Sequence, residues 1–131
     1  MRDPAHGPLA ARRVLVVEDE LTVRATTVRA LTEAGYAVLE AAHGQEALDI
    51  LDQQRAQMDL VVTDLGMPVM DGHELARRLR QTRPGVPILF ISGYGDTGTV
   101  SPFLRKPFSP DDLVERVGKL LADIQADGPR A

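Results

Sequence analysis

The chain has 131 residues and a net charge of −4, with 15 Lys and Arg against 19 Asp and Glu, and it contains no Cys. The length predicts one domain, the charge lacks the basic footprint of a nucleic-acid binder, and the missing Cys excludes disulfides, iron–sulfur clusters and cysteine nucleophiles. The longest apolar runs, residues 14–17 and 88–91, are too short to span a bilayer, and residues 1–13 carry no apolar signal segment, so we expect a soluble cytoplasmic domain without membrane contact.

Short apolar runs alternate with helical patterns along the chain. Runs rich in β-branched and other apolar residues predict five strands, at residues 13–17, 36–41, 59–63, 87–91 and 103–105. Apolar residues at helical spacing predict helices over residues 21–34, 45–54, 72–81 and from 110 onward. Gly35 is placed to end the first helix, and Asp71 and Ser109 are placed as N-caps of the third and the last.

This alternation of strands and helices predicts a parallel sheet with helices on both faces. The strand patterns lack an apolar–polar alternation, which is typical of strands buried on both sides. The expected fold is α/β and flavodoxin-like, a doubly wound sheet of five parallel strands in the order 2-1-3-4-5. We expect the domain to cover residues 13–125, between an N-terminal tail at 1–12 and a C-terminal tail at 126–131.

Polar side chains follow four of the predicted strands, where ligands bind in sheets of this kind. Glu18 and Asp19 follow the first strand, Asp64 the third, Ser92 the fourth and Lys106 the fifth. Converging carboxylates repel one another unless a cation lies between them, and an all-oxygen donor set favours Mg²⁺, with Mn²⁺ as a substitute. The competing interpretation is that acids here, Glu20 above all, only stabilise the start of the following helix.

Four stretches, each after a predicted strand, carry a resemblance to a known family. They are Val14-Leu-Val-Val-Glu-Asp-Glu20, Thr63-Asp-Leu-Gly-Met-Pro-Val-Met-Asp-Gly72, Ile91-Ser-Gly-Tyr94 and Phe103-Leu-Arg-Lys-Pro-Phe108. With them, the sequence resembles the receiver domain of two-component response regulators over about residues 12–125. The resemblance implies a phosphorylated switch that takes its phosphoryl group from a histidine kinase or a histidine phosphotransfer protein, a stoichiometric acceptor rather than an enzyme.

The resemblance implies a role for each polar residue at the strand ends. Asp64 resembles the phosphoacceptor, a carboxylate nucleophile. Asp19, Asp64 and the main-chain carbonyl of Gly66 would hold Mg²⁺, and Glu18 would reach the ion through a water molecule. Lys106 and the metal would stabilise the charge on the phosphoryl oxygens during transfer.

Further positions resemble the switch and the loops of the family. Ser92 would hydrogen-bond the phosphoryl group, and Phe103 is the aromatic residue whose rotamer reports that event. Pro68 and Gly72 would shape the loop beside the acceptor, and Pro107 would follow a cis peptide bond after Lys106.

The segment between the fourth and fifth strands departs from the family pattern. It has ten residues, 93–102, with three glycines and a closing proline, so we expect a loop or a single turn where most receivers carry a fourth helix. That helix belongs to a common dimer face, so we expect a monomer or a weak, phosphorylation-dependent dimer. Gly66 and Tyr94 are the residues expected to set the lifetime of the phosphorylated state, because Gly66 leaves the group uncovered and Tyr94 would shield it from water.

Other functions remain alternatives at this stage. A pseudo-receiver would bind partners without phosphorylation, but it has no need for the set of Asp19, Asp64, Ser92 and Lys106. A Mg²⁺-dependent phosphatase on a related sheet would place a second Asp where this chain has Gly66, and a flavin module would place hydroxyl groups where it has Glu18. A receiver can also be a stand-alone regulator, a phosphorelay shuttle or a segment of a hybrid histidine kinase.

Overall fold

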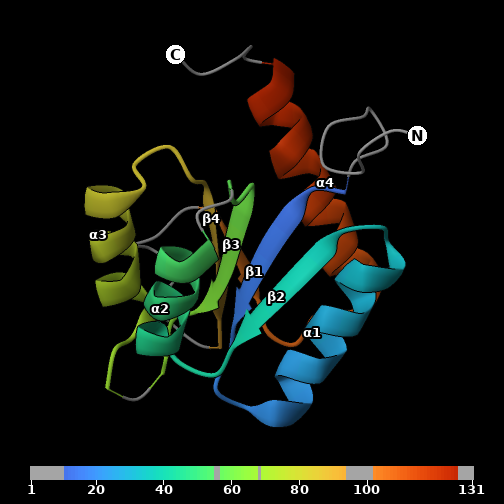
Figure 1. Ribbon diagram of the computed structural model, residues 1–131. Coiled ribbons are helices and arrows are strands. Elements are labelled where there is room, and N and C mark those ends of the chain that lie inside the picture. Colours follow the sequence, from blue (N-terminus) through green and yellow to red (C-terminus); the bar gives the residue numbers. More distant parts are fainter. Residues whose placement is uncertain (1–10, 55–56, 68, 94–101, 127–131) are drawn as a thin grey trace.

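The computed structural model describes residues 11–54, 57–67, 69–93 and 102–126 (Figure 1). Its elements, in chain order, are β1 (Arg13–Val17), α1 (Leu21–Glu33), β2 (Ala37–Ala41), α2 (Gly44–Gln54), β3 (Leu60–Asp64), α3 (Gly72–Thr82), β4 (Ile88–Ser92), β5 (Phe103–Arg105) and α4 (Pro110–Ala126). Among the described residues, no helix is both long and apolar enough to cross a membrane.

The five strands form one parallel sheet in the order β2-β1-β3-β4-β5. Helices α1 and α4 cover one face of this sheet, and α2 and α3 cover the other (Figure 1). The predicted fold class and strand order are therefore confirmed. Because β1 has β2 on one side and β3 on the other, the strand order reverses next to β1, which places a crevice at the carboxyl ends of β1 and β3.

The side chains of successive residues in the central strands pack alternately into two separate hydrophobic cores. Leu15, Val61 and Phe90 pack against α2 and α3, whereas Val14, Val62 and Leu89 pack against α1 and α4. All residues of β3 and β4 are buried, as the continuous apolar runs predict for strands covered on both faces. This burial holds the strand ends, and the polar residues that follow them, in fixed positions.

The ends of the elements follow the predicted turn chemistry closely. The Asp71 carboxylate accepts the N–H of Glu74 at 2.9 Å, and Gly35 ends α1 with a φ of +103°. Strands β3 and β4 each lie one residue later than predicted, at 60–64 rather than 59–63 and at 88–92 rather than 87–91, and β2 begins at 37 rather than 36. Pro87 has no N–H for the ladder and contributes only its carbonyl, which accepts from Val61 at 3.0 Å.

Some predictions fall on segments outside the described residues. They include residues 1–10 and 127–131 of the predicted tails and most of the connection between β4 and β5, so the expected loss of the fourth helix stays a prediction from the ten-residue spacing. Ala126, predicted to begin the C-terminal tail, is the last residue of α4. Tyr94 and Pro68 also lie outside the described residues.

Candidate functional site

The turn between β1 and α1, which we call the acidic turn (residues 18–20), carries the first carboxylates. The N–H of Glu18 donates to the carbonyl of Ala41 at the end of β2, at 3.0 Å, so the turn begins as a continuation of the sheet. Glu18 is buried and Asp19 is exposed. The carboxylate of Glu18 accepts the N–H of Glu20 at 3.1 Å, whereas the Glu20 side chain makes no cap hydrogen bond to α1.

Asp64 is the last residue of β3 and is buried. The chain folds back tightly behind it, because the N–H of Gly72 donates to the Leu65 carbonyl at 2.9 Å. A Cβ atom at Gly72 would lie 2.5 Å from the carbonyl oxygen of Asp64, so only glycine fits at this position without a shift. The predicted loop-shaping part of Gly72 thus has a steric basis.

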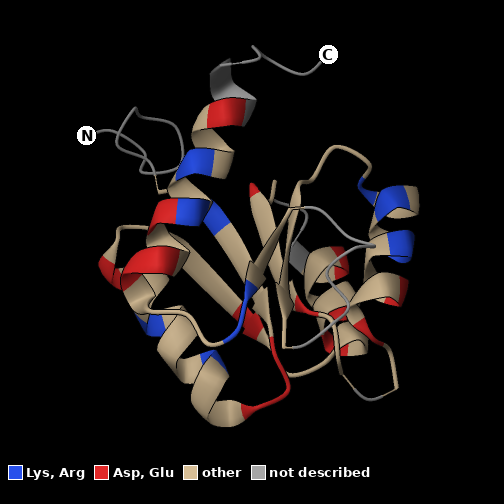
Figure 2. Ribbon diagram, turned by 180° about the vertical axis from the view of Figure 1, so that it is seen from behind, with Lys and Arg blue, Asp and Glu red and all other residues tan. Residues whose placement is uncertain are grey.

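The structure brings Glu18, Asp19 and Asp64 together at the carboxyl edge of the sheet. One carboxylate oxygen of each lies within 4.8 Å of the others. The red acidic turn lies at the lower edge of the molecule, where α1 begins (Figure 2). Three carboxylates with no nitrogen or sulfur donor form the oxygen-rich set that Mg²⁺ prefers, so these residues fit that ion.

Lys106 reaches the same cluster from the loop after β5. Its Nζ lies 3.4 Å from Asp64 Oδ1 and 3.4 Å from Glu18 Oε1, and the Lys106–Pro107 bond is cis, as expected. The N–H of Lys106 donates to the Ser92 carbonyl at 2.7 Å, which ties the loop to the end of β4. Three carboxylates against one ammonium leave two negative charges, which a divalent cation would balance.

The pKa values in the cluster reflect this crowding. Burial raises the pKa of Glu18 above its usual range and the charge of Asp64 adds to the rise, although the Glu20 N–H and the Lys106 ammonium act the other way. Partial burial works against the charge of Lys106, yet the charges of Asp64 and Glu18 prevail and raise the pKa of Lys106. Lys106 therefore stays cationic at neutral pH.

The remaining predicted residues that the structure describes are Ser92, Phe103 and Gly66. Ser92 is buried at the end of β4. Strand β4 is the neighbour of β3, which ends in Asp64. Phe103 begins β5, and its side chain is partly buried against the α2–α3 core. Its carbonyl accepts from the guanidinium of Arg116 in α4 at 2.5 Å. Gly66 is exposed, and a Cβ atom there would have nothing within 4 Å.

Two residues near the site, Arg24 and Val69, were not predicted from the sequence. Arg24 in α1 donates to the Glu18 carbonyl at 2.9 Å and to the Glu40 carboxylate at 3.1 Å. A single arginine on a helix is usually a solvated surface charge. Only its position six residues after Glu18 could have indicated a contact with the acidic turn. Val69, in the loop after Asp64, has a positive φ of 67° and is fully exposed, which nothing in its residue type predicts.

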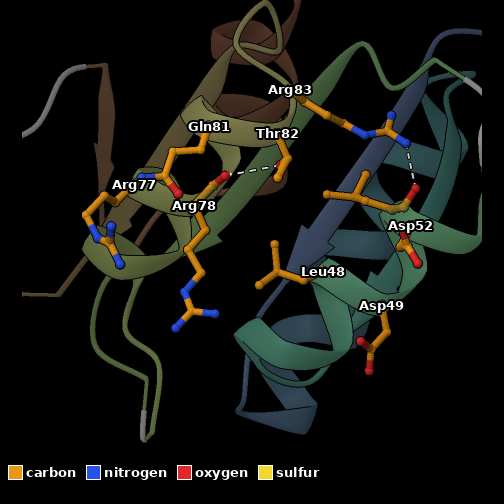
Figure 3. A pocket seen from close by; sticks show the side chains of 9 residues that line it. Leu48, Asp49, Asp52, Arg77, Arg78, Gln81, Thr82 and Arg83 are labelled. Carbon is orange, nitrogen blue, oxygen red and sulfur yellow. Dashed lines mark hydrogen bonds between the residues drawn. The ribbon is translucent and has the colours of Figure 1, made fainter.

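A hollow of about 780 Å³ lies away from the acidic cluster, between α2 and α3 (Figure 3). Leu48, Asp49 and Asp52 line it from α2, and arginines line it from α3 and the turn that follows. Its lining comes from the C-terminal halves of both helices, whereas the N-terminal residue of α3 touches Asp64. This hollow is therefore separate from the candidate site.

Comparisons with known proteins agree with this geometry. The family described as "Response regulator receiver domain" matches residues 14–118. The chain is 44% identical to the sensor kinase CckA of Brucella abortus (strain 2308) over 116 residues, which are 82% of this chain but 12% of that protein. It is 36% identical to the response regulator receiver protein CpdR of the same organism, over 84% of this chain and 97% of that one.

Solved structures show the same likeness. The receiver domain from the hybrid histidine kinase CckA is 44% identical, with a TM-score of 0.73, and covers 83% of this chain and 98% of that one. The chemotaxis protein CheY4 of Vibrio cholerae is 30% identical, with a TM-score of 0.77, and covers 84% and 98%. The family match, the strand order and the gathered acidic cluster lead to one conclusion: the chain belongs to the response regulator receiver domain family.

Proposed function

We propose that this chain is a phosphorylated switch of a two-component system whose phosphoacceptor is Asp64. The observation that carries the proposal is the surroundings of the Asp64 carboxylate, which lies beside the carboxylates of Glu18 and Asp19 and has the Lys106 ammonium 3.4 Å from its Oδ1. A nucleophile needs a free carboxylate that is oriented by its surroundings, and the burial of β3 supplies the orientation. Asp64 is thus an oriented carboxylate nucleophile with the ammonium group of Lys106 beside it.

In the proposed reaction, an Asp64 carboxylate oxygen attacks the phosphorus of a phosphohistidine on the donor protein. The new P–O bond forms as the P–N bond breaks, and the leaving imidazole nitrogen keeps the electron pair and takes up a proton. Lys106 binds one phosphoryl oxygen with its ammonium and holds it there after transfer. Asp19, Asp64 and the Gly66 carbonyl would hold Mg²⁺, with Glu18 outside them through a water molecule, and the ion would supply charge stabilisation to the phosphoryl oxygens.

The product would change the charge at the end of β3. A phosphoryl group adds nearly two negative charges and three acceptor oxygens. We infer that the Ser92 hydroxyl moves to bond one of these oxygens and that the Phe103 ring follows, because both belong to the paired strands β4 and β5. The outcome is a shift between two arrangements of this edge of the sheet.

The phosphodonor protein must contact the rim around Asp64, and one part of this rim is apolar. A hollow of about 240 Å³ lies between α1 and the loop of Lys106, Pro107 and Phe108. Leu21, which precedes the lining residue Thr22 at the start of α1, is 68% exposed, so a docked partner could remove its apolar surface from water. We propose that the phosphohistidine domain of a histidine kinase or of a phosphotransfer protein docks over Leu21 and this hollow.

The proposal is tested by incubating the chain with acetyl phosphate, a donor that needs no docking surface. We expect labelling that requires Mg²⁺ and that is lost in Asp64→Asn, which keeps the shape of the side chain but removes the nucleophile. Leu21→Asp should keep this labelling and slow transfer from a kinase that phosphorylates the native chain. A pseudo-receiver would show no labelling under any of these conditions.

A further inference from the structure

Arg24 is not part of the acidic cluster, but its side chain contacts the backbone of the acidic turn. Arg24 lies in the first turn of α1, and its Nη1 donates to the carbonyl oxygen of Glu18 at 2.9 Å. Its Nε donates to Glu40 Oε1, on strand β2, at 3.1 Å. The guanidinium therefore connects three segments, namely α1, β2 and the acidic turn.

The burial of Arg24 fits a fixed guanidinium better than a mobile surface charge. Its side chain is 16% exposed, against 81% for Arg29, which pairs with Glu33 farther along the same helix. The Nε and Nη1 atoms of a planar guanidinium point in different directions, so one arginine reaches two acceptors at once. A lysine has a single ammonium on a flexible stem and cannot hold both in the same geometry.

The other contacts of the acidic turn hold the Glu18 N–H, the Glu18 carboxylate and the backbone of Glu20, and the Glu18 carbonyl accepts its bond from Arg24. The Glu18 N–H is fixed by the Ala41 carbonyl, and the Glu20 side chain makes no cap hydrogen bond to α1. The Glu18 carbonyl lies at the peptide that joins Glu18 to Asp19, so the bond from Arg24 fixes the plane of that peptide. The plane of this peptide limits the directions that the exposed Asp19 side chain can take.

From these contacts we propose that Arg24 is a positioning residue, which holds the Glu18–Asp19 peptide so that both carboxylates face Asp64 at the distance a divalent cation needs. This inference rests on the proposed function for the use of the cation, but it concerns Mg²⁺ binding, which is measured separately. Residues that orient metal ligands from outside the ligand set change metal affinity by about 10-fold or more when they are replaced. Arg24 would act in this way through the backbone.

The experiment compares Arg24→Met with Arg29→Met, a matched control that breaks an ion pair on the same helix away from the cluster. Mg²⁺ dissociation constants are measured by titration of the backbone amide resonances, which report only the folded protein. We expect Arg24→Met to weaken Mg²⁺ binding about tenfold, Arg24→Lys to weaken it less, and Arg29→Met to leave it unchanged. Labelling by acetyl phosphate should fall in Arg24→Met at limiting Mg²⁺ and recover at saturating Mg²⁺.

The outcomes separate this inference from the proposed function. A purely structural part for Arg24 would lower the melting temperature and leave the Mg²⁺ affinity of the folded protein unchanged, which would overturn the inference. If Arg24→Met does not fold, the comparison of Arg24→Lys with the native chain decides by the same criterion. A native chain that binds Mg²⁺ at the cluster without being labelled at Asp64 would contradict the proposed function and leave the part of Arg24 to be judged on its affinity.

Discussion

Val69 has a strained backbone conformation, and its exposed side chain makes no packing contact that would compensate for the strain. Its φ of 67° lies in the left-handed region, where a β-branched side chain collides with its own backbone, and the side chain is fully exposed. Asn tolerates this conformation much better than Val. Val69→Asn should therefore stabilise the fold by about 1 kcal/mol, measured as a rise in the midpoint of urea unfolding. An unchanged or lower midpoint would show that the loop carries no such strain.

Glu74 is a surface carboxylate whose ion pairs with two arginines make a small contribution to stability that depends on pH. Hydrogen bonds from the Arg77 and Arg78 guanidinium groups lower the pKa of Glu74 to about 2 from an ordinary value of 4.5. The folded state therefore binds this proton less readily than the unfolded state, so the stabilisation is complete above pH 4.5 and is lost as the pH falls through 2. Glu74→Gln should make unfolding stability depend less steeply on pH within this window. Equal slopes in both proteins would contradict the assignment.

The individual site residues differ in how far the sequence revealed them. Asp19, Asp64 and Lys106 each lie at or just beyond the carboxyl end of a strand. The rule that the carboxyl ends of parallel strands meet at one edge was therefore enough to predict that they come together. Arg24 escaped this rule because its partners, Glu18 and Glu40, are brought to it by the packing of α1 on the sheet. The φ of Val69 escaped as well, because the loop between β3 and α3 imposes it against the preference of the residue.

At the scale of elements, the close approach of α3 to β3 depends on Gly72. A methyl group there would meet the Asp64 carbonyl oxygen at 2.5 Å and the Leu65 Cα at 2.9 Å, both of them backbone atoms that cannot rotate away. Gly72→Ala should destabilise the domain by roughly 1–3 kcal/mol and slow labelling by acetyl phosphate, because Asp64 must shift. Gly85→Ala is the matched control, since a Cβ atom at Gly85 would have nothing within 4 Å. Equal stability of the two variants would contradict this packing.

Strands and helices were predictable here because the local signals agree with the tertiary structure. Buried β-branched runs, the Asp71 cap and the Gly35 stop each produce the element that their chemistry favours. Strands β2, β3 and β4 each begin one residue later than predicted, because pairing with the neighbouring strands, and not the apolar run, decides where a strand begins. The register between strands was beyond local patterns, since it depends on which side chains pack across the sheet.

At the scale of the whole molecule, folding of the five strands brings the carboxylates of the acidic cluster together, and their repulsion lowers the free energy of unfolding. Mg²⁺ should therefore raise the melting temperature, by binding the folded chain in preference to the unfolded one. Asp19→Asn should raise the melting temperature without Mg²⁺, since it removes one of the repelling charges, and it should abolish most of the further rise with Mg²⁺. A rise of the same size in the native chain and the variant would indicate that the ion binds elsewhere.

The most direct test of the central claim identifies the residue that takes up the phosphoryl group. The chain is labelled with acetyl phosphate and Mg²⁺, treated with sodium borohydride, which reduces an aspartyl phosphate to homoserine, and mapped by peptide mass spectrometry. We predict homoserine at position 64 alone, and none when Mg²⁺ is removed by a chelator. Homoserine at Asp19 or at another aspartate, or no conversion under conditions that label a known receiver domain, would contradict the account.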